Sequence, residues 1–176
     1  MATGSRAAGQ VLTSQELAQP IALGERCVAP IIRLTANGAD FEAYVESPFA
    51  RAALAGATAR LMHQPLESSF VNRAVRPGYR IRFGRLPEAP LPAAVTHVRV
   101  RSSGREAAPI AELNERFFVG TVPSHGIVEP LRARFPEYVF EQLPAGDFVL
   151  VVGTTHGTYR FTVTARERAS VMRVCN

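Results

Sequence analysis

Arginine is the residue type in this sequence best placed to do chemistry, because several arginines alternate with apolar residues. The alternation runs through residues 79–85 (YRIRFGR) and 95–101 (VTHVRVR), and a third alternating run covers residues 159–164. Successive side chains of a strand point to opposite faces of a sheet, so this alternation gathers the basic residues on one face. If the first two runs pair, that face holds Arg80, Arg82, His97, Arg99 and Arg101, with Arg160 joining from the third run. Arginine donates a fork of hydrogen bonds to phosphate, sulfate or carboxylate groups, so the pattern predicts an anion-binding face.

Two other interpretations of these arginines stay open. All twenty basic residues are Arg and none is Lys, which is typical of a bias in genome composition, so the net charge of +5 says little about nucleic acid or membrane partners. By strand parity Tyr79 and Phe83 point away from the arginines, and that face therefore lacks the stacking rings of single-strand nucleic acid binders. The simplest interpretation is a solvated face with Glu partners on neighbouring strands. An anionic small molecule or acidic glycan comes second, and nucleic acid third.

No residue pattern typical of an active site or a metal site occurs in the sequence. The serines lie in no G-x-S-x-G motif, no Gly-rich loop precedes a Lys, and the four histidines have neither i, i+4 nor H-x-H spacing. No sequence feature pairs a cysteine with a histidine. Glu42 and Glu46 share strand parity, as paired glycosidase carboxylates would, although the solvent-facing side of an edge hairpin is the simpler role. We therefore predict a protein that is not an enzyme and that uses no metal and no cofactor.

The two cysteines, Cys27 and Cys175, lie far apart in the sequence and have no CxxC spacing. If the terminal strands pair, a disulfide between them would close a loop of about 149 residues and stabilise the fold by about 4–5 kcal/mol. Two separate thiols are the alternative. Export would favour the disulfide, and a periplasmic or secreted location is the one we expect. Residues 1–19 lack the features of a signal peptide, and no apolar run is long enough for a transmembrane helix.

Local turn and cap signals predict where hairpins and a helix lie. Asn-Gly at residues 37–38, between two strand-like runs, is a strong signal for a hairpin. Ser-Pro at residues 47–48 supplies an N-cap and a first residue for a helix over about residues 48–63, whose apolar side is mostly Ala. Residues 146–164 predict a second hairpin, whose first strand is apolar on both faces. Residues 128–135, bounded by prolines, are expected to make a helical turn.

The spacing of these signals predicts the fold class. About eight or nine short strand-like runs are separated by turn signals, and one helix is inserted after the second run. This order favours a mainly β, antiparallel β-sandwich over βαβ units, which need a helix between strands. Residues 1–25, where Pro20 and Gly24 oppose a long helix, are expected to form an arm or loop. Residues 26–176 are expected to form a single sandwich domain, with a proline-rich connector at residues 86–94.

The run LPAGDFVLVVGTTHGTYRFTV, about twenty residues long, resembles the terminal hairpins of bacterial extracytoplasmic Ig-like or transthyretin-like sandwiches. The resemblance implies a fold and no activity. We therefore predict an exported β-sandwich that acts as a binding or assembly module. It would use protein–protein contacts or β-edge pairing, with a partner protein or with other copies of itself. A receptor for an anionic ligand, lined by the arginines named above, is the second hypothesis, and an enzyme is the third.

Overall fold

The structure is a computed structural model that describes residues 12–39, 41–63, 65–66, 71–72, 76–85, 94–124 and 127–175. For residues 114–124 and 127–135 the description covers the backbone alone. The connector expected at residues 86–94 lies outside the described residues except for its last position, and so does the beginning of the expected arm.

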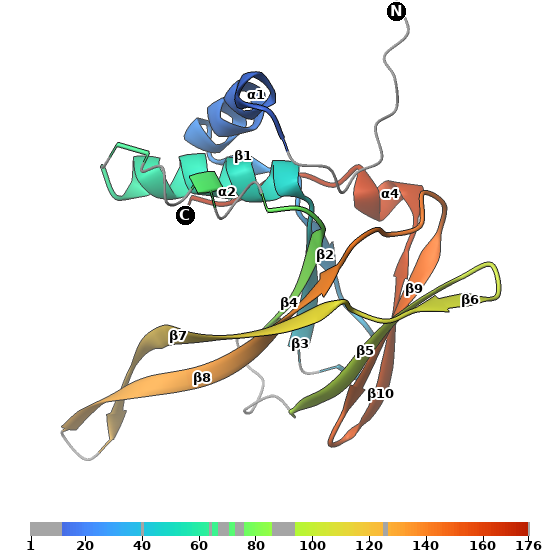
Figure 1. Ribbon diagram of the computed structural model, residues 1–176. Helices are drawn as coiled ribbons and strands as arrows, with labels where there is room; N and C mark the ends of the chain where they lie inside the picture. Colours follow the sequence, from blue (N-terminus) through green and yellow to red (C-terminus); the bar gives the residue numbers. More distant parts are fainter. Residues whose placement is uncertain are drawn as a thin grey trace, which may run out of the picture.

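The fold is mainly β and consists of two antiparallel sheets packed face to face (Figure 1). One sheet has five strands in the order β2-β3-β4-β8-β7, and the other has four in the order β10-β9-β5-β6. A separate two-stranded ribbon joins β1 to β11. The strands are β1 (Val28–Ala29), β2 (Ile32–Leu34), β3 (Phe41–Glu46), β4 (Tyr79–Arg85), β5 (Val95–Ser102), β6 (Arg105–Ala107), β7 (Ala111–Ser124), β8 (Ile127–Phe140), β9 (Phe148–Thr154), β10 (Gly157–Val163) and β11 (Met172–Arg173). The antiparallel sandwich predicted from the sequence is confirmed.

Apolar side chains from both sheets meet in one core between them. The ring of Phe41 on β3 joins the two sheets, because its centroid lies 5.7 Å from that of Phe83 on β4, 5.2 Å from Tyr159 and 5.6 Å from Phe161, both on β10. Alternate side chains of a strand face the same side, so β3, β4, β5, β9 and β10 each give every second residue to the core. The residues in between face outward, away from this core.

Both predicted hairpins are present. β2 and β3 pair across the turn at residues 37–38, where Gly38 has a φ of +75° that favours glycine. β9 and β10 pair along their full lengths, and Thr154 Oγ1 closes their turn by accepting hydrogen bonds from the N–H groups of His156 (3.1 Å) and Gly157 (3.2 Å). β9 lies inside the four-stranded sheet, and β10 forms one of its edges.

Helix α1 (Ser14–Glu25) replaces part of the arm expected over residues 1–25. It begins with a capping box between Thr13 and Glu16 and continues through Pro20, whose side chain is fully buried. Proline in a helix interior removes a hydrogen bond, so tertiary packing must stabilise the helix at this point. The expectation of a loop is wrong for these residues because it weighed the local signals alone.

The one helix predicted from the sequence is present as α2 (Pro48–Leu61), and α1 packs on it at one end of the sandwich (Figure 1). Ser47 caps α2 by accepting a hydrogen bond from Ala50 N at 3.1 Å. The alanines of α2 are buried, and the two helix backbones approach so closely that a Cβ atom on Gly24 would lie 1.9 Å from Ala53 O. Small residues on both helices therefore make this contact possible.

Residues 128–135, expected to make a helical turn, belong to the long strand β8. Prolines are tolerated in a strand that has a neighbour on one side only, so they did not mark a helix end here. β8 pairs with β7 from Ser124 and Ile127 back to Ala111 and Val139, but only residues 138–140 of β8 also pair with β4. Most of this hairpin extends beyond the sandwich as a two-stranded ribbon (Figure 1), which we call the β7–β8 arm (residues 114–124 and 127–136).

The segment that follows α1 is held to the C-terminal end of the described chain. β1 and β11 pair antiparallel, and Cys27 forms a disulfide with Cys175 beside them. The structure thus has the first of the two cysteine arrangements that the sequence left open. Between β10 and β11, the short helix α4 (Ala165–Arg168) begins with a capping box of Thr164 and Glu167.

Candidate functional site

The six residues of the predicted basic face lie on two different sheets. β4 pairs with β3 and β8, whereas β5 pairs with β9 and β6, so the strand pairing that would have joined them is wrong. Arg80 and Arg82 face outward from the five-stranded sheet. The other four face outward from the four-stranded sheet: His97, Arg99, Arg101 and Arg160. Alternation cannot tell whether two strands belong to one sheet or to two facing sheets. Strands of opposite sheets show the same pattern when both face the core between them.

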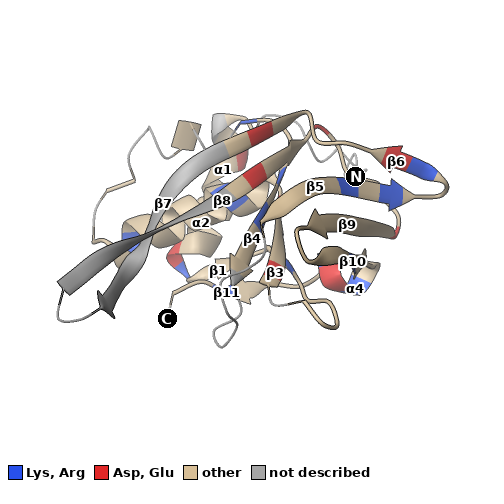
Figure 2. Cartoon of the chain, turned by 90° about the horizontal axis from the view of Figure 1, so that it is seen from below, with Lys and Arg blue, Asp and Glu red and all other residues tan. Residues whose placement is uncertain are grey.

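The four residues His97, Arg99, Arg101 and Arg160 are called the basic face below. Arg99 of β5 and Arg160 of β10 lie on either side of β9, where Val151 is the register partner of both. Glu106 of β6 forms ion pairs with Arg101 and, at 3.5 Å, with Arg99. Figure 2 shows these charges on β5 and β6. The side chains of the three ion-paired residues are 38–53% exposed, so each pair stabilises the fold by at most about 1 kcal/mol.

His97 lies over a glycine of the neighbouring strand. A Cβ atom on Gly153 would lie 1.9 Å from Cε1 of His97, so the imidazole fills the space that a side chain at residue 153 would take. His97 is the register partner of Gly153, and the register of β5 and β9 shifts between Val95 and His97. The glycine therefore lets an exposed histidine rest against the sheet beside the arginines.

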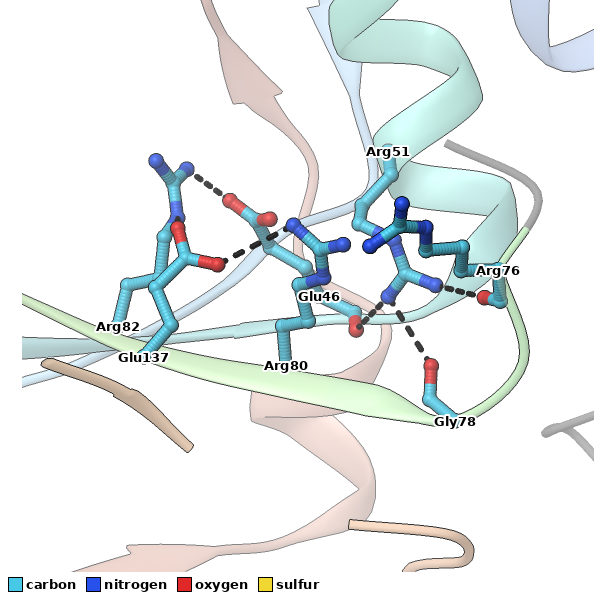
Figure 3. Close-up of polar contacts among 7 residues, drawn as sticks. All are labelled: Glu46, Arg51, Arg76, Gly78, Arg80, Arg82 and Glu137. Atoms are coloured by element: carbon cyan, nitrogen blue, oxygen red, sulfur yellow. Dashed lines mark hydrogen bonds and ion pairs between the residues drawn. The ribbon is translucent and has the colours of Figure 1, made fainter. Parts of the chain in front are cut away.

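The outer face of the five-stranded sheet holds buried carboxylates in a network with arginines (Figure 3). Glu46 is 3% exposed and Glu137 is 2% exposed. Arg80 Nη1 lies 3.1 Å from Glu137 Oε2. Arg82 forms an ion pair with Glu46, and its Nε lies 3.9 Å from Glu137 Oε1. Each carboxylate therefore has a cation beside it, as a charge out of contact with water requires.

Glu42 is a third buried carboxylate on this outer face, and it is 3% exposed. It accepts hydrogen bonds from Arg33 Nε at 3.0 Å and from the hydroxyl of Tyr44. Burial alone raises the pKa of a carboxyl, but these two hydrogen bonds outweigh it and hold the pKa of Glu42 below its ordinary value. Burial, together with the bond to Glu42, raises the pKa of Tyr44 to about 12.

The expectation that Glu42 and Glu46 lie on the solvent-facing side of an edge hairpin is wrong. β3 lies inside its sheet, between β2 and β4, and both carboxylates bind arginines of these neighbouring strands. The register places Glu46 opposite Arg80, so opposite charges face one another across the strands. With both carboxylates bound in this way, we assign them to holding the sheet together rather than to glycosidase chemistry.

Arg51 connects α2 to the sheet (Figure 3). It is 6% exposed, and its guanidinium donates hydrogen bonds to three backbone carbonyls. Nη1 donates to Glu46 O at 3.2 Å and to Gly78 O at 3.0 Å, and Nη2 donates to Arg76 O. Burial, and after it the nearby charge of Arg80, lowers the pKa of Arg51 to about 10, which leaves it charged at neutral pH. One side chain therefore fixes the ends of β3 and β4 against the helix.

Acid should weaken the fold through Glu42. Because its pKa is lower in the folded protein, Glu42 contributes stability that is complete above its ordinary pKa of about 4.5 and is lost as the pH falls through the folded value. Replacing Glu42 with Gln should therefore flatten the fall in the free energy of unfolding below about pH 4.5. Urea titrations from pH 7 to pH 3 measure this. Exposed Glu106→Gln is the matched control, and equal pH profiles for the two variants would contradict the assignment.

A pocket of about 410 Å³ lies between α1 and the end of α2. Its lining mixes apolar and charged side chains: Ile21, Glu25, Gly56, Ala59, Arg60, His63, Pro65 and Leu66. His63 has a φ of +51°, but nothing else at the pocket indicates a ligand. Among the described residues, no group of three or more His, Cys, Asp or Glu side chains is placed to hold a metal ion.

The sheet edges differ greatly in length. β2 and β6 have three residues each and β10 has seven, whereas β7 has fourteen. β10 also contacts β2 and α4, so its edge is partly covered. β8 carries Pro130 and Pro136, which cannot donate to a further strand, but residues 111–122 of β7 contain no proline. The outer edge of β7 is therefore the longest edge in the described part of the sandwich, with one register shift between Phe118 and Thr121.

Comparisons with known proteins identify no relative, since no family model, no curated protein and no solved structure matches this chain. The resemblance to Ig-like or transthyretin-like hairpins therefore stays a prediction. In the part of the chain that the structure describes, no helix has the length and apolar character needed to cross a membrane.

Proposed function

We propose that this protein is a non-enzymatic assembly module, and that two copies join by pairing the outer edges of their β7 strands. The observation that supports this most strongly is the β7–β8 arm. Its strand β7 runs for fourteen residues and has no neighbour on its outer side among the described strands. Unpaired backbone N–H and C=O groups along such an edge pair readily with a strand of another chain.

A second copy of the chain fits this edge well. Antiparallel pairing of β7 with β7 is symmetric about a twofold axis, so each copy offers the same surface. A two-stranded ribbon is marginally stable alone in water, whereas three or more strands with an apolar face are stable. Pairing between copies would give each arm two further strands and would join the two five-stranded sheets into one. Assembly thus gives the arm the neighbouring strands that the sandwich does not provide.

We also infer that the protein works in an oxidising compartment, periplasmic or secreted. The support is the disulfide between Cys27 and Cys175. Such a bond persists outside the cytosol, where glutathione and thioredoxin do not keep thiols reduced.

Sedimentation velocity over protein concentrations from low micromolar to submillimolar tests the assembly. The intact chain should form a dimer. A variant in which Asn-Gly replaces residues 116–134 should stay monomeric, because it loses most of β7. This replacement joins Glu115 to Phe135, which are register partners, so it keeps the base of the hairpin.

The control variant is Ala107→Pro, which blocks the short edge strand β6 and should leave the dimer unchanged. Circular dichroism and thermal unfolding verify that each variant is folded. A monomeric intact chain at every concentration would contradict the proposal. Dimerisation of the shortened variant with unchanged affinity would contradict the role of β7.

A further inference from the structure

We propose that the basic face (His97, Arg99, Arg101 and Arg160) binds a linear acidic glycan that carries sulfate or carboxylate groups. The face lies on the outside of the four-stranded sheet, on β5 and β10, whereas the edge proposed for assembly belongs to the five-stranded sheet. The glycan site is therefore independent of the assembly, and either proposal can fail without the other.

The cations of the basic face are spread in two directions over a flat surface. Arg99 and Arg101 are two residues apart on β5, which places their Cα atoms about 7 Å apart along the strand. Arg160 lies across β9 from Arg99, two strand spacings or about 10 Å away. Among the described residues, Arg160 forms no ion pair and is exposed. An extended ligand with repeated charges can reach all of these groups at once.

A single small anion fits the face less well than a polymer. A site for one phosphate or sulfate needs donors that converge on it, often from backbone N–H groups. Here the backbone of β9 pairs with β5 on one side and with β10 on the other, and β5 pairs with β6 at Val100–Ser102. The arginines lie on the outer side of the sheet, on the separate strands β5 and β10. Affinity must therefore come from several separate contacts, which a chain of anionic sugars supplies.

Nucleic acid and membranes are poorer matches for the same surface. Single-stranded nucleic acids stack their bases on aromatic rings, but Tyr159 and Phe161 of β10 face the core and leave no Phe or Tyr on the outer side of β5, β9 or β10. A membrane surface would need exposed large apolar side chains beside the charges. The exposed large apolar residues of the described chain lie elsewhere, at Leu61, Met62, Ile110 and Val171.

Glu106 sets how many arginine donors are available to a ligand. It holds Arg99 and Arg101 side by side through its two ion pairs, and a bound sulfate would compete with it for them. Replacing Glu106 with Gln removes the only acid that pairs with this face in the described residues. That variant should bind a polyanion more tightly than the unchanged protein. If the face were only solvated, the gain would be no larger than the change of one unit in net charge produces.

Elution from immobilised heparin in a salt gradient, and titration with heparin in solution, test the glycan site. The double variant Arg99→Gln/Arg160→Gln should bind heparin about tenfold more weakly or worse, because it loses two charge-assisted contacts. Arg26→Gln/Arg173→Gln is the matched control, since both residues are exposed and lie near the disulfide, away from this face. It carries the same change in net charge and should bind nearly as well as the unchanged protein.

Four outcomes decide the proposal. Weaker binding by the face variant alone, with tighter binding by Glu106→Gln, supports it. An equal loss in the face variant and its control shows that net charge alone drives retention, and overturns it. Absence of heparin binding at physiological salt also overturns it. Preferential binding to single-stranded oligonucleotide or to vesicles with anionic lipid, measured with the same variants, would replace the glycan by that ligand. Thermal unfolding verifies that each variant is folded.

Discussion

Replacing Arg51 with Met is expected to lower the free energy of unfolding by about 3 kcal/mol, at about 1 kcal/mol for each carbonyl left without its donor. The carbonyls belong to Glu46, Arg76 and Gly78, and the contacts to Glu46 and Gly78 are buried. Met has a similar length and keeps the packing of the aliphatic part. The loss therefore reports on the hydrogen bonds that connect α2 to the ends of β3 and β4. Urea unfolding at pH 7, followed by circular dichroism, measures it.

Arg60→Met on the same helix is the control for this variant. Arg60 also donates to a backbone carbonyl, that of Glu25, but in an exposed position where water can replace it. Its replacement should change the free energy of unfolding by no more than about 0.5 kcal/mol. Arg51→Lys, which keeps a charge and part of the donor set, should fall between the two. If Arg51→Met were no less stable than Arg60→Met, Arg51 would not connect the helix to the sheet.

Replacing Cys27 and Cys175 together with Ala is expected to lower the free energy of unfolding by about 4–5 kcal/mol. The bond joins residues 148 positions apart, so without it the unfolded chain gains much conformational entropy. The strands it holds, β1 and β11, have two residues each, which is too short to pair stably without help. Urea unfolding of the double variant and of the unchanged protein measures the difference.

A reductant supplies the matched comparison for the disulfide. Dithiothreitol should destabilise the unchanged protein by about the same amount as the double replacement, and it should leave the double variant unaffected. Mass spectrometry after alkylation reports whether both thiols are free in each sample. A loss of less than about 1 kcal/mol with both thiols free would show that the ends are held by packing alone.

The features that the sequence predicts correctly are the ones that depend on neighbours in the chain. The turn at residues 37–38 needs a positive φ, which glycine supplies, and it forms where expected. Ser47 and Pro48 mark the start of α2 because capping is a contact between adjacent turns. The apolar run at residues 148–152 becomes a buried inner strand, since its composition suits burial on both faces.

The features that the sequence could not predict depend on contacts between distant residues. Helix α1 forms around Pro20 and Gly24 because α2 offers a close-packed surface, and no local signal reports that surface. The assignment of β4 and β5 to different sheets follows from how the chain crosses the core. Parity alone is the same for both arrangements, so alternation cannot reveal that the six predicted basic residues divide between the two sheets.

The burial of the carboxylates likewise depends on contacts between residues that are distant in the sequence. Glu42 and Glu46 lie on one side of their strand, as predicted from parity, but their burial depends on which strands stand beside them. Once β4 is known to be the neighbour, the register of Glu46 with Arg80 makes a charge network expected. Strand pairing is therefore the information that was missing, rather than the chemistry of the residues.

Amide hydrogen exchange of the unchanged protein at two concentrations, one below and one above the dimerisation range, measures pairing at the β7 edge most directly. Amides of residues 111–122 should become more protected at the higher concentration, because their outward N–H groups gain partners. Amides of the short edge strands β2 and β6 should exchange at the same rate in both samples. Identical exchange of β7 at both concentrations would contradict assembly through this edge.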